Sequence, residues 1–347
     1  MLFTAFVLNG EDMPREKLSI NFDGSYTEIY KLGCGLVLRE PTVVAVSTEN
    51  AKDIKAFGED AKKLIGKTAE KTKIVFPVFE CEIVNEKVAS ELLRYFLRKV
   101  EVNGKMNAVT ALFSVPCGVS RESLNKYERV AKNAGIDKVH FAYAPLLAVI
   151  GQQIPVNDYN PYFVVDICSG TTNFAAVTLD GIIKGFSLNI GANKISTDII
   201  DYVAEVYGLQ IGIPTAERLK KEIGSLCDDD GLALTVSGRE TKTGLPKTLT
   251  LKAFELVDPI KKYFEKLVEY AMSLIVKLPP EVSSEIRKSG IYISGEDTTI
   301  YGLKDYVTDR TKIKTNIAEN ADTVKALGGG TVLGNSELLK KLSIKYD

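Results

Sequence analysis

The residues best placed to do chemistry lie in the segment 164–177. Two apolar stretches are joined there by a tight polar turn, and Asp166 stands at the end of the first stretch. The small residue Gly170 would let backbone N–H groups approach phosphate oxygens, and the hydroxyls of Thr171 and Thr172 would add donors. Asp166 would suit a hydrated Mg²⁺ ion. The alternative is an ordinary β-hairpin without a ligand, in which the threonines simply favour strand.

The amino-acid composition argues against several classes of function. The chain has 347 residues, of which 45% are hydrophobic, and a net charge of -1, which suits two domains or one large divided domain. This charge gives no electrostatic support for binding nucleic acid. The 5 cysteines form no CxxC pair, so we expect a reduced, cytoplasmic compartment and no structural zinc site. The 1 histidine, His140, stands next to Phe141 at the end of an apolar strand, where a core or edge role is expected, and this argues against Ser-His-Asp and Cys-His catalysis.

The beginning of the chain is apolar but lacks the basic flank and small-residue cleavage site of a signal peptide. No apolar run is long enough to cross a bilayer. One hypothesis is peripheral contact with the inner face of the cell membrane through Leu2, Phe3 and Phe6. The alternative is a strand or an unstructured end.

Hydrophobic periodicity predicts alternating strands and helices, and therefore an α/β class. A hairpin is expected around the turn Asp23-Gly24, which is a strong turn signal. Gly135 stands where a left-handed helix cap is expected. The elements predicted in the first half are the hairpin 18–31, a strand 36–46, a helix 54–64, a helix 88–100, a strand 108–115 and a helix 121–134.

The second half repeats this order of elements. The prediction there is a hairpin 162–177, a strand 181–190, helices 194–207 and 215–223, strands 232–237 and 248–251, a helix 257–278 and a strand 290–294. Because a hairpin, further strands and helices occur twice, we expect a duplicated architecture.

Several ordered motifs after Ile20 resemble those of MreB, the family of bacterial actins that control cell shape. The segments that carry the resemblance are 30–45, 56–63, 115–118, 145–155, 191–194, 215–224, 237–240, 243–247 and 328–330. The resemblance implies an actin-like, ribonuclease H-like duplicated fold with two lobes around a central cleft. Lobe I would comprise 1–155 plus 325–347, with a small subdomain at about 39–89. Lobe II would comprise 156–324, with a small subdomain at about 191–254.

The resemblance also implies a nucleotide site in the cleft, with ATP and Mg²⁺ as its ligands. The matching positions are Gly24, Ser25, Asp166, Gly170, Thr171, Thr172, Glu217, Lys220 and Gly295, with Asp166 toward the metal. The pair Glu217 and Lys220 has a plainer interpretation as an i,i+3 surface pair.

The departures from the family pattern all fall in this cleft. Cys168 and Ser169 stand where the second phosphate loop has two glycines, and Asp23 stands at a glycine of the first loop. A carboxylate there would repel phosphate. In the adenosine loop, Glu296 and Asp297 replace glycines.

The family's catalytic acids are also replaced. Their positions hold Tyr143 and Ala144, neither of which is a general base at neutral pH. No catalytic residue is therefore assigned, and we expect weak or absent ATP hydrolysis. Such a protein would act by assembling with itself or with an authentic MreB, and with cell-wall morphogenesis proteins. The alternatives are an active filament-forming ATPase and, with less support, a small-molecule kinase.

Overall fold

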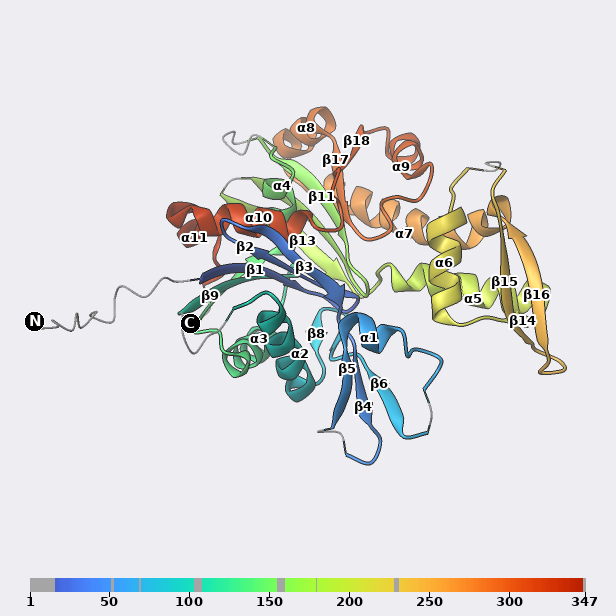
Figure 1. Ribbon diagram of the computed structural model, residues 1–347. Coiled ribbons are helices and arrows are strands. Elements are labelled where there is room, and N and C mark those ends of the chain that lie inside the picture. Colours follow the sequence, from blue (N-terminus) through green and yellow to red (C-terminus); the bar gives the residue numbers. More distant parts are fainter. Residues whose placement is uncertain are drawn as a thin grey trace, which may run out of the picture.

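The computed structural model describes residues 16–50, 53–68, 70–102, 108–154, 160–178, 180–227 and 231–345. Its main body contains two five-stranded sheets with helices on their faces, and two three-stranded sheets project from this body (Figure 1). The predicted α/β class is therefore confirmed. No helix among these described ranges is both long and apolar enough to cross a membrane.

The first five-stranded sheet has the order β10-β9-β1-β2-β3. Its strands are β1 (Glu16–Phe22), β2 (Tyr26–Lys31), β3 (Gly35–Pro41), β9 (Val109–Val115) and β10 (Lys138–Tyr143). β1, β2 and β3 are antiparallel neighbours, whereas β9 is parallel to both β1 and β10. Helices α2 (Glu86–Lys99) and α3 (Arg121–Ala134) bury their apolar faces in the same core cluster as these strands.

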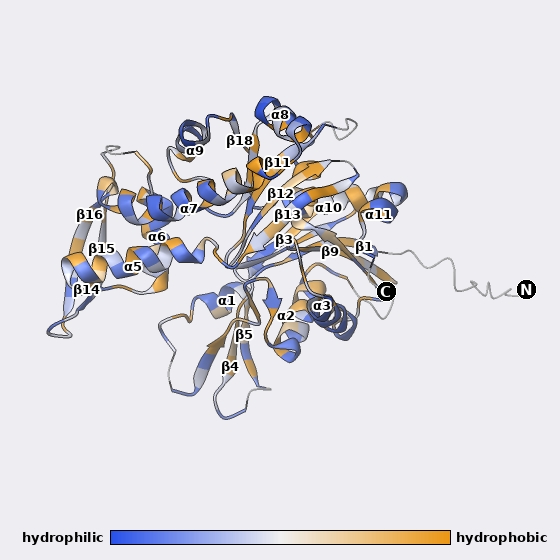
Figure 2. Ribbon diagram, turned by 180° about the vertical axis from the view of Figure 1, so that it is seen from behind, coloured by the Kyte–Doolittle hydropathy of each residue, from blue (hydrophilic) through white to orange (hydrophobic). Residues whose placement is uncertain are grey.

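The second sheet repeats this plan with the order β13-β12-β11-β17-β18. Its strands are β11 (Tyr162–Ile167), β12 (Thr172–Thr178), β13 (Gly181–Leu188), β17 (Ile291–Gly295) and β18 (Thr315–Ile317). Three antiparallel neighbours are again followed by two parallel strands. The duplicated architecture predicted from the sequence is thus present, and the apolar strands form the interior of the main body (Figure 2).

Helices α4 (Ala144–Gly151) and α10 (Val324–Gly334) pack closely against each other, and their core cluster includes strands of both sheets. A Cβ added to Gly328 would lie 1.9 Å from the carbonyl oxygen of Leu147. A Cβ added to Gly151 would lie 2.0 Å from that of Val324. Only glycine fits such a close approach of two backbones.

The smaller sheets are β5-β4-β6 and β14-β15-β16. The first is formed by β4 (Val44–Ser47), β5 (Ile54–Phe57) and β6 (Thr72–Val75), beside α1 (Gly58–Lys62). The second is formed by β14 (Leu209–Gln210), β15 (Ala233–Glu240) and β16 (Pro246–Lys252), near α5 (Asn193–Tyr207) and α6 (Ile213–Ile223). The remaining elements are β7 (Val78–Phe79), β8 (Glu82–Ile83), the 3₁₀-helix η1 (Ala253–Leu256), α7 (Val257–Val276), α8 (Pro280–Ser289), α9 (Leu303–Thr311) and α11 (Ser336–Leu342).

Two predicted elements were wrong. The helix predicted at 54–64 is strand β5 followed by the short helix α1. Phe57 pairs with Val44 as strand, and the positive φ of Gly58, 54°, prevents a continuous helix through this position. The strand predicted at 36–46 divides into β3 and β4 between Pro41 and Val44. The cap at Gly135 is confirmed by its left-handed φ of 104°.

Candidate functional site

The turn between β1 and β2 faces the turn between β11 and β12. Asp23 is only 5% exposed and its carboxylate accepts hydrogen bonds from Ser169 Oγ at 2.8 Å and from the Ser169 backbone N–H at 3.4 Å. The Gly24 N–H lies 2.6 Å from the same carboxylate. Donors from both turns, among them the predicted Gly24, therefore bind a side chain of the protein itself. Ser25 uses its backbone oxygen to accept a bond from Thr42.

The tip of the β7–β8 hairpin covers the second of these turns. A Cβ on Gly170 would lie 2.9 Å from Glu80 Cα, so the two backbones are in close contact. Cys81 Sγ lies 3.1 Å from Thr171 Oγ1. The buried hydroxyl of Tyr127 lies 3.0 Å from the carbonyl oxygen of Cys81, which holds the hairpin tip in place.

Asp166 is fully buried and is already paired with a cation. Lys325, on α10, places its Nζ 3.2 Å from the Asp166 carboxylate, and both side chains are almost inaccessible to water. Ser294 Oγ and Asn173 Nδ2 donate to the same carboxylate at 3.0 and 3.2 Å. Burial alone would lower the pKa of Lys325, but Asp166 and its acidic neighbours outweigh burial and raise that pKa well above its usual value. The lysine is therefore an ammonium ion in the folded protein.

Thr172 does not face the turn that contains Thr171. Its hydroxyl donates to the carbonyl oxygen of Ile190 at 2.7 Å and lies 3.2 Å from the Tyr263 hydroxyl. Thr172 thus contributes to packing inside the second half of the molecule.

A second polar group surrounds the end of β17. Lys220 is buried and lies 2.9 Å from Asp297 and 3.2 Å from Glu217. Gly295 has a φ of 95°, and a Cβ on it would lie 1.9 Å from the carbonyl oxygen of Ile167. Burial raises the pKa of Asp297 to about 6, although Lys220 opposes that shift. Glu217 and Lys220 are therefore more than a surface pair, since Lys220 balances a buried acid.

Glu296 interacts electrostatically with Asp23 at the first turn and with Asp297 and Lys220 at the end of β17. Burial raises the pKa of this carboxyl well above its usual value, and the negative charges of Asp23 and Asp297 raise it further. Burial and the neighbouring acids thus both favour the protonated form of Glu296.

Tyr143 and Ala144 mark the junction of β10 with α4. Burial raises the pKa of the Tyr143 hydroxyl, which makes it a still poorer base than a free tyrosine. Ala144 is buried and has no polar side chain.

The residues present do not fit a nucleotide phosphate with a bound metal ion in this arrangement. The side chain of Asp23 accepts hydrogen bonds from Ser169 and Gly24, and its negative charge would repel phosphate oxygens. The metal-organising Asp166 is neutralised by Lys325.

Lys325 and Cys81 are site residues that the sequence did not predict. The signal for Lys325 was a single lysine in the otherwise apolar run 324–334. Cys81 gave no comparable signal, because only the hairpin brings it to Thr171.

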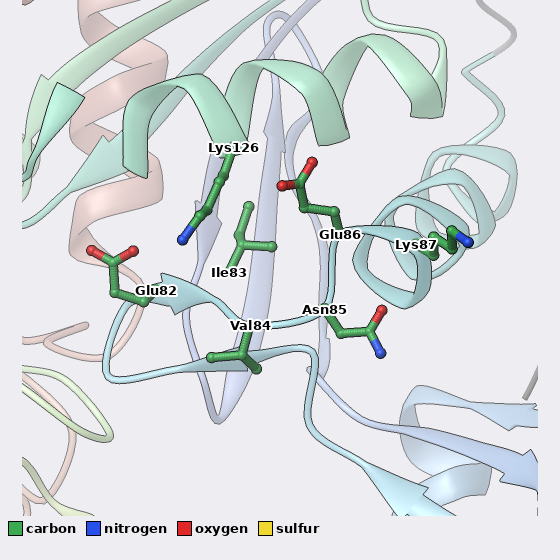
Figure 3. A pocket seen from close by; sticks show the side chains of 7 residues that line it. All are labelled: Glu82, Ile83, Val84, Asn85, Glu86, Lys87 and Lys126. Atoms are coloured by element: carbon green, nitrogen blue, oxygen red, sulfur yellow. The ribbon is translucent and has the colours of Figure 1, made fainter. Parts of the chain in front are cut away.

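An open hollow lies elsewhere, away from these turns. It has a volume of about 630 Å³ and is lined by Glu82, Ile83, Val84, Asn85, Glu86, Lys87 and Lys126, at the junction of β8 with α2 beside α3 (Figure 3). None of the predicted site residues lines it. Arg129 pairs with Glu86 at its edge.

Known proteins resemble this chain in both sequence and fold. The sequence profile of the MreB/Mbl proteins matches residues 15–341. The chain belongs to the MreB/Mbl family. The cell shape-determining protein MreB of Escherichia coli K12 is 33% identical over 321 residues, covering 91% of this chain and 92% of that protein. The cell shape-determining protein Mbl of Bacillus subtilis is 28% identical, with 90% and 94% covered.

Solved structures of the MreB/Mbl type and of a more distant protein share the fold. MreB5 of Spiroplasma citri bound to AMPPNP superposes with a TM-score of 0.88 at 25% identity, covering 94% of this chain and 97% of that one. MamK in a double helical filament has a TM-score of 0.78 at 16% identity, covering 93% and 99%. The actin-like fold implied by the sequence motifs is therefore confirmed.

Proposed function

We propose that this bacterial actin-like protein acts in cell shape as a filament subunit or filament partner, with weak or absent ATP hydrolysis. The cytoskeletal role follows from membership of the MreB/Mbl family. The observation that supports the loss of hydrolysis is the bonding of Asp23 to Ser169, which uses the donors of the second turn. Tyr143 and Ala144 support it too, because neither can activate a water molecule.

The alternative is an active ATPase that uses altered residues. Its support is the likeness to MreB5 structures that hold AMPPNP or ADP. Retained nucleotide contact would use Asp166, Glu217 and Lys220, after Asp166 had exchanged Lys325 for a metal ion. Phosphate release from ATP that is abolished by Asp166→Ala would establish this alternative.

The deciding experiment is calorimetric titration of the purified protein with ATP, with and without Mg²⁺. We expect no binding at millimolar ATP, and sedimentation of assembled protein that does not depend on ATP. Tight, Mg²⁺-dependent binding would overturn the proposal for the nucleotide site and leave the family role unchanged.

The partners are proposed at the level of the family. We infer self-assembly, or co-assembly with an authentic MreB, in contact with cell-wall morphogenesis proteins. The lobe boundaries of the sequence analysis remain part of this proposal, with the first and second sheets as the two lobe cores.

Peripheral membrane contact through Leu2, Phe3 and Phe6 remains a prediction, and these residues lie outside the described part of the chain. Flotation with liposomes tests it. Binding that is unchanged after removal of residues 1–8 would refute it.

A further inference from the structure

Three metal-ligating side chains from distant parts of the sequence meet in the cleft. They are Asp23 after β1, Cys81 at the tip of the β7–β8 hairpin and Cys168 after β11. Their ligand atoms all lie within 4.8 Å of one another, and all three side chains are buried. In the part of the chain that the structure describes, no other group of three or more His, Cys, Asp and Glu side chains has its ligand atoms so close together.

The separation between Cys81 and Asp23 suits two ligands of a tetrahedral ion. With Zn–S bonds of about 2.3 Å and Zn–O bonds of about 2.1 Å, a sulfur and an oxygen ligand lie about 3.6 Å apart. Cys81 Sγ lies 3.7 Å from Asp23 Oδ1. Thr171 Oγ1, at 3.1 Å from Cys81 Sγ, lies beside the group as a neutral oxygen donor.

The hairpin is built in an unfavourable conformation that aims Cys81 inward. Glu80 and Cys81 form a two-residue loop, and both have positive φ values, 49° and 57°. Glycine or asparagine is usual in such a turn, and other residues are strained there. Strain of this kind is often found at functional sites.

The charge balance also favours a cation. The carboxyl groups of Asp23 and Asp166 share this buried region with one ammonium group, that of Lys325. Lys325 Nζ lies 3.2 Å from Cys168 Sγ, where it would hydrogen-bond a sulfur ligand from outside the coordination sphere. Excess negative charge in a buried site is costly unless a cation offsets it.

We propose that Asp23, Cys81 and Cys168 bind one divalent, zinc-type ion, which ties the β1–β2 turn and the β7–β8 hairpin to the β11–β12 turn. Two thiols and a carboxylate make a donor set that favours Zn²⁺ over Mg²⁺. On binding, the two thiols form two Zn–S bonds and release their two protons to the solvent. The spacing of the cysteines led to the expectation of no structural zinc site, and this proposal departs from it because the donors meet only in the folded chain.

The test uses the full-length protein purified without chelator and without nucleotide, so its outcome is separate from that of the ATP titration. Elemental analysis should find a single zinc ion per chain. Titration of the apo-protein with Co²⁺ should give a thiolate-to-cobalt charge-transfer band. Cys81→Ser and Cys168→Ser should each weaken Co²⁺ binding at least about tenfold.

The matched controls are Cys117→Ser, which changes a buried cysteine outside the group, and Cys34→Ser, which changes an exposed one. Both should keep the ion and the band. If either serine variant at the site unfolds by circular dichroism, Asp23→Asn decides, because it keeps the side-chain shape and removes the carboxylate ligand. Absence of metal from the wild-type protein, retention in all three site variants, or a Cys81–Cys168 disulfide in peptide mapping would overturn the proposal.

Discussion

Ser169 donates a 2.8 Å hydrogen bond to Asp23, a residue 146 positions earlier in the chain. The two residues belong to equivalent turns of the two repeated sheets, one after β1 and one after β11. Each turn would be expected to present donors to a phosphate group lying between them. Here an acid on one turn accepts two hydrogen bonds from Ser169 of the other, so the protein's own side chains hold the two turns together.

Replacing Asp23 by glycine should therefore improve ATP binding. The change removes the negative charge and frees the Ser169 donors. We expect Asp23→Gly to bind ATP measurably at millimolar concentration, where the wild type shows no binding. Isothermal titration calorimetry measures it.

The matched control for this change is Asp53→Gly at an exposed aspartate, which should leave ATP affinity unchanged. Equal affinity in wild type and Asp23→Gly would show that Asp23 does not block the cleft.

Lys325→Met should destabilise the fold strongly. The substitution leaves the carboxylate of Asp166 buried without its cation, and breaking a buried pair on one side costs about 3 to 5 kcal/mol. Urea unfolding followed by circular dichroism gives the free energy of unfolding. The double variant Lys325→Met with Asp166→Asn should recover most of the loss, because no unpaired charge remains. Lys304→Met, at an exposed position, is the control.

Glu28 should make stability depend on pH. Burial raises its pKa from 4.5 to about 8, and the hydrogen bond from Asn21 only partly opposes this shift. Because the folded state holds this proton more tightly than the unfolded chain, the contribution of Glu28 is fully present below 4.5 and is lost as pH rises through about 8.

Glu28→Gln should remove that dependence, because glutamine stays neutral and can still accept the bond from Asn21. The melting temperature of the variant should exceed that of wild type at about pH 8 and fall less steeply between about pH 5 and about pH 8. Glu319→Gln, at an exposed glutamate, should follow the wild-type curve. Parallel curves for Glu28→Gln and wild type would contradict the raised pKa.

Two glycines of the same helix should respond oppositely to alanine. In Gly328→Ala the new methyl group would meet the Leu147 carbonyl at 1.9 Å and push α4 from α10, at a cost of about 1 to 3 kcal/mol. In Gly334→Ala the methyl would meet only Leu32 Cδ1 at 3.6 Å, an ordinary contact. This second variant should be neutral or slightly more stable, because alanine favours helix. Thermal unfolding of both variants tests this difference. Equal losses of melting temperature in the two variants would contradict it.

Periodicity and turn chemistry predicted most of the fold, because those signals are local. The amphipathic pattern of α3 and its cap at Gly135 needed no tertiary information. Helix α4 was missed since seven of its eight residues are buried, which leaves no polar face to create a helical period. The segment 54–57 was predicted as helix because its pairing with β4 depends on residues outside the local window.

The candidate site was predicted only in part, for a similar reason. Motif similarity located the turns that contain Gly24 and Gly170, and the structure brings them together. It did not show that Lys325 would neutralise Asp166, a contact between residues 159 positions apart. Nor did the position of Lys220 in the sequence reveal its buried partner Asp297.

The pairing of Asp166 with Lys325 bears on whether old and new subunits of a polymer would differ from one another. A subunit that binds and hydrolyses ATP carries an irreversible chemical record of how long ago it bound its nucleotide. A subunit that does not hydrolyse ATP, as proposed for this protein, carries no such record, so all of its copies in a polymer are equivalent. Growth and shrinkage would then follow protein concentration and partner binding alone, at both ends and at every age of the polymer.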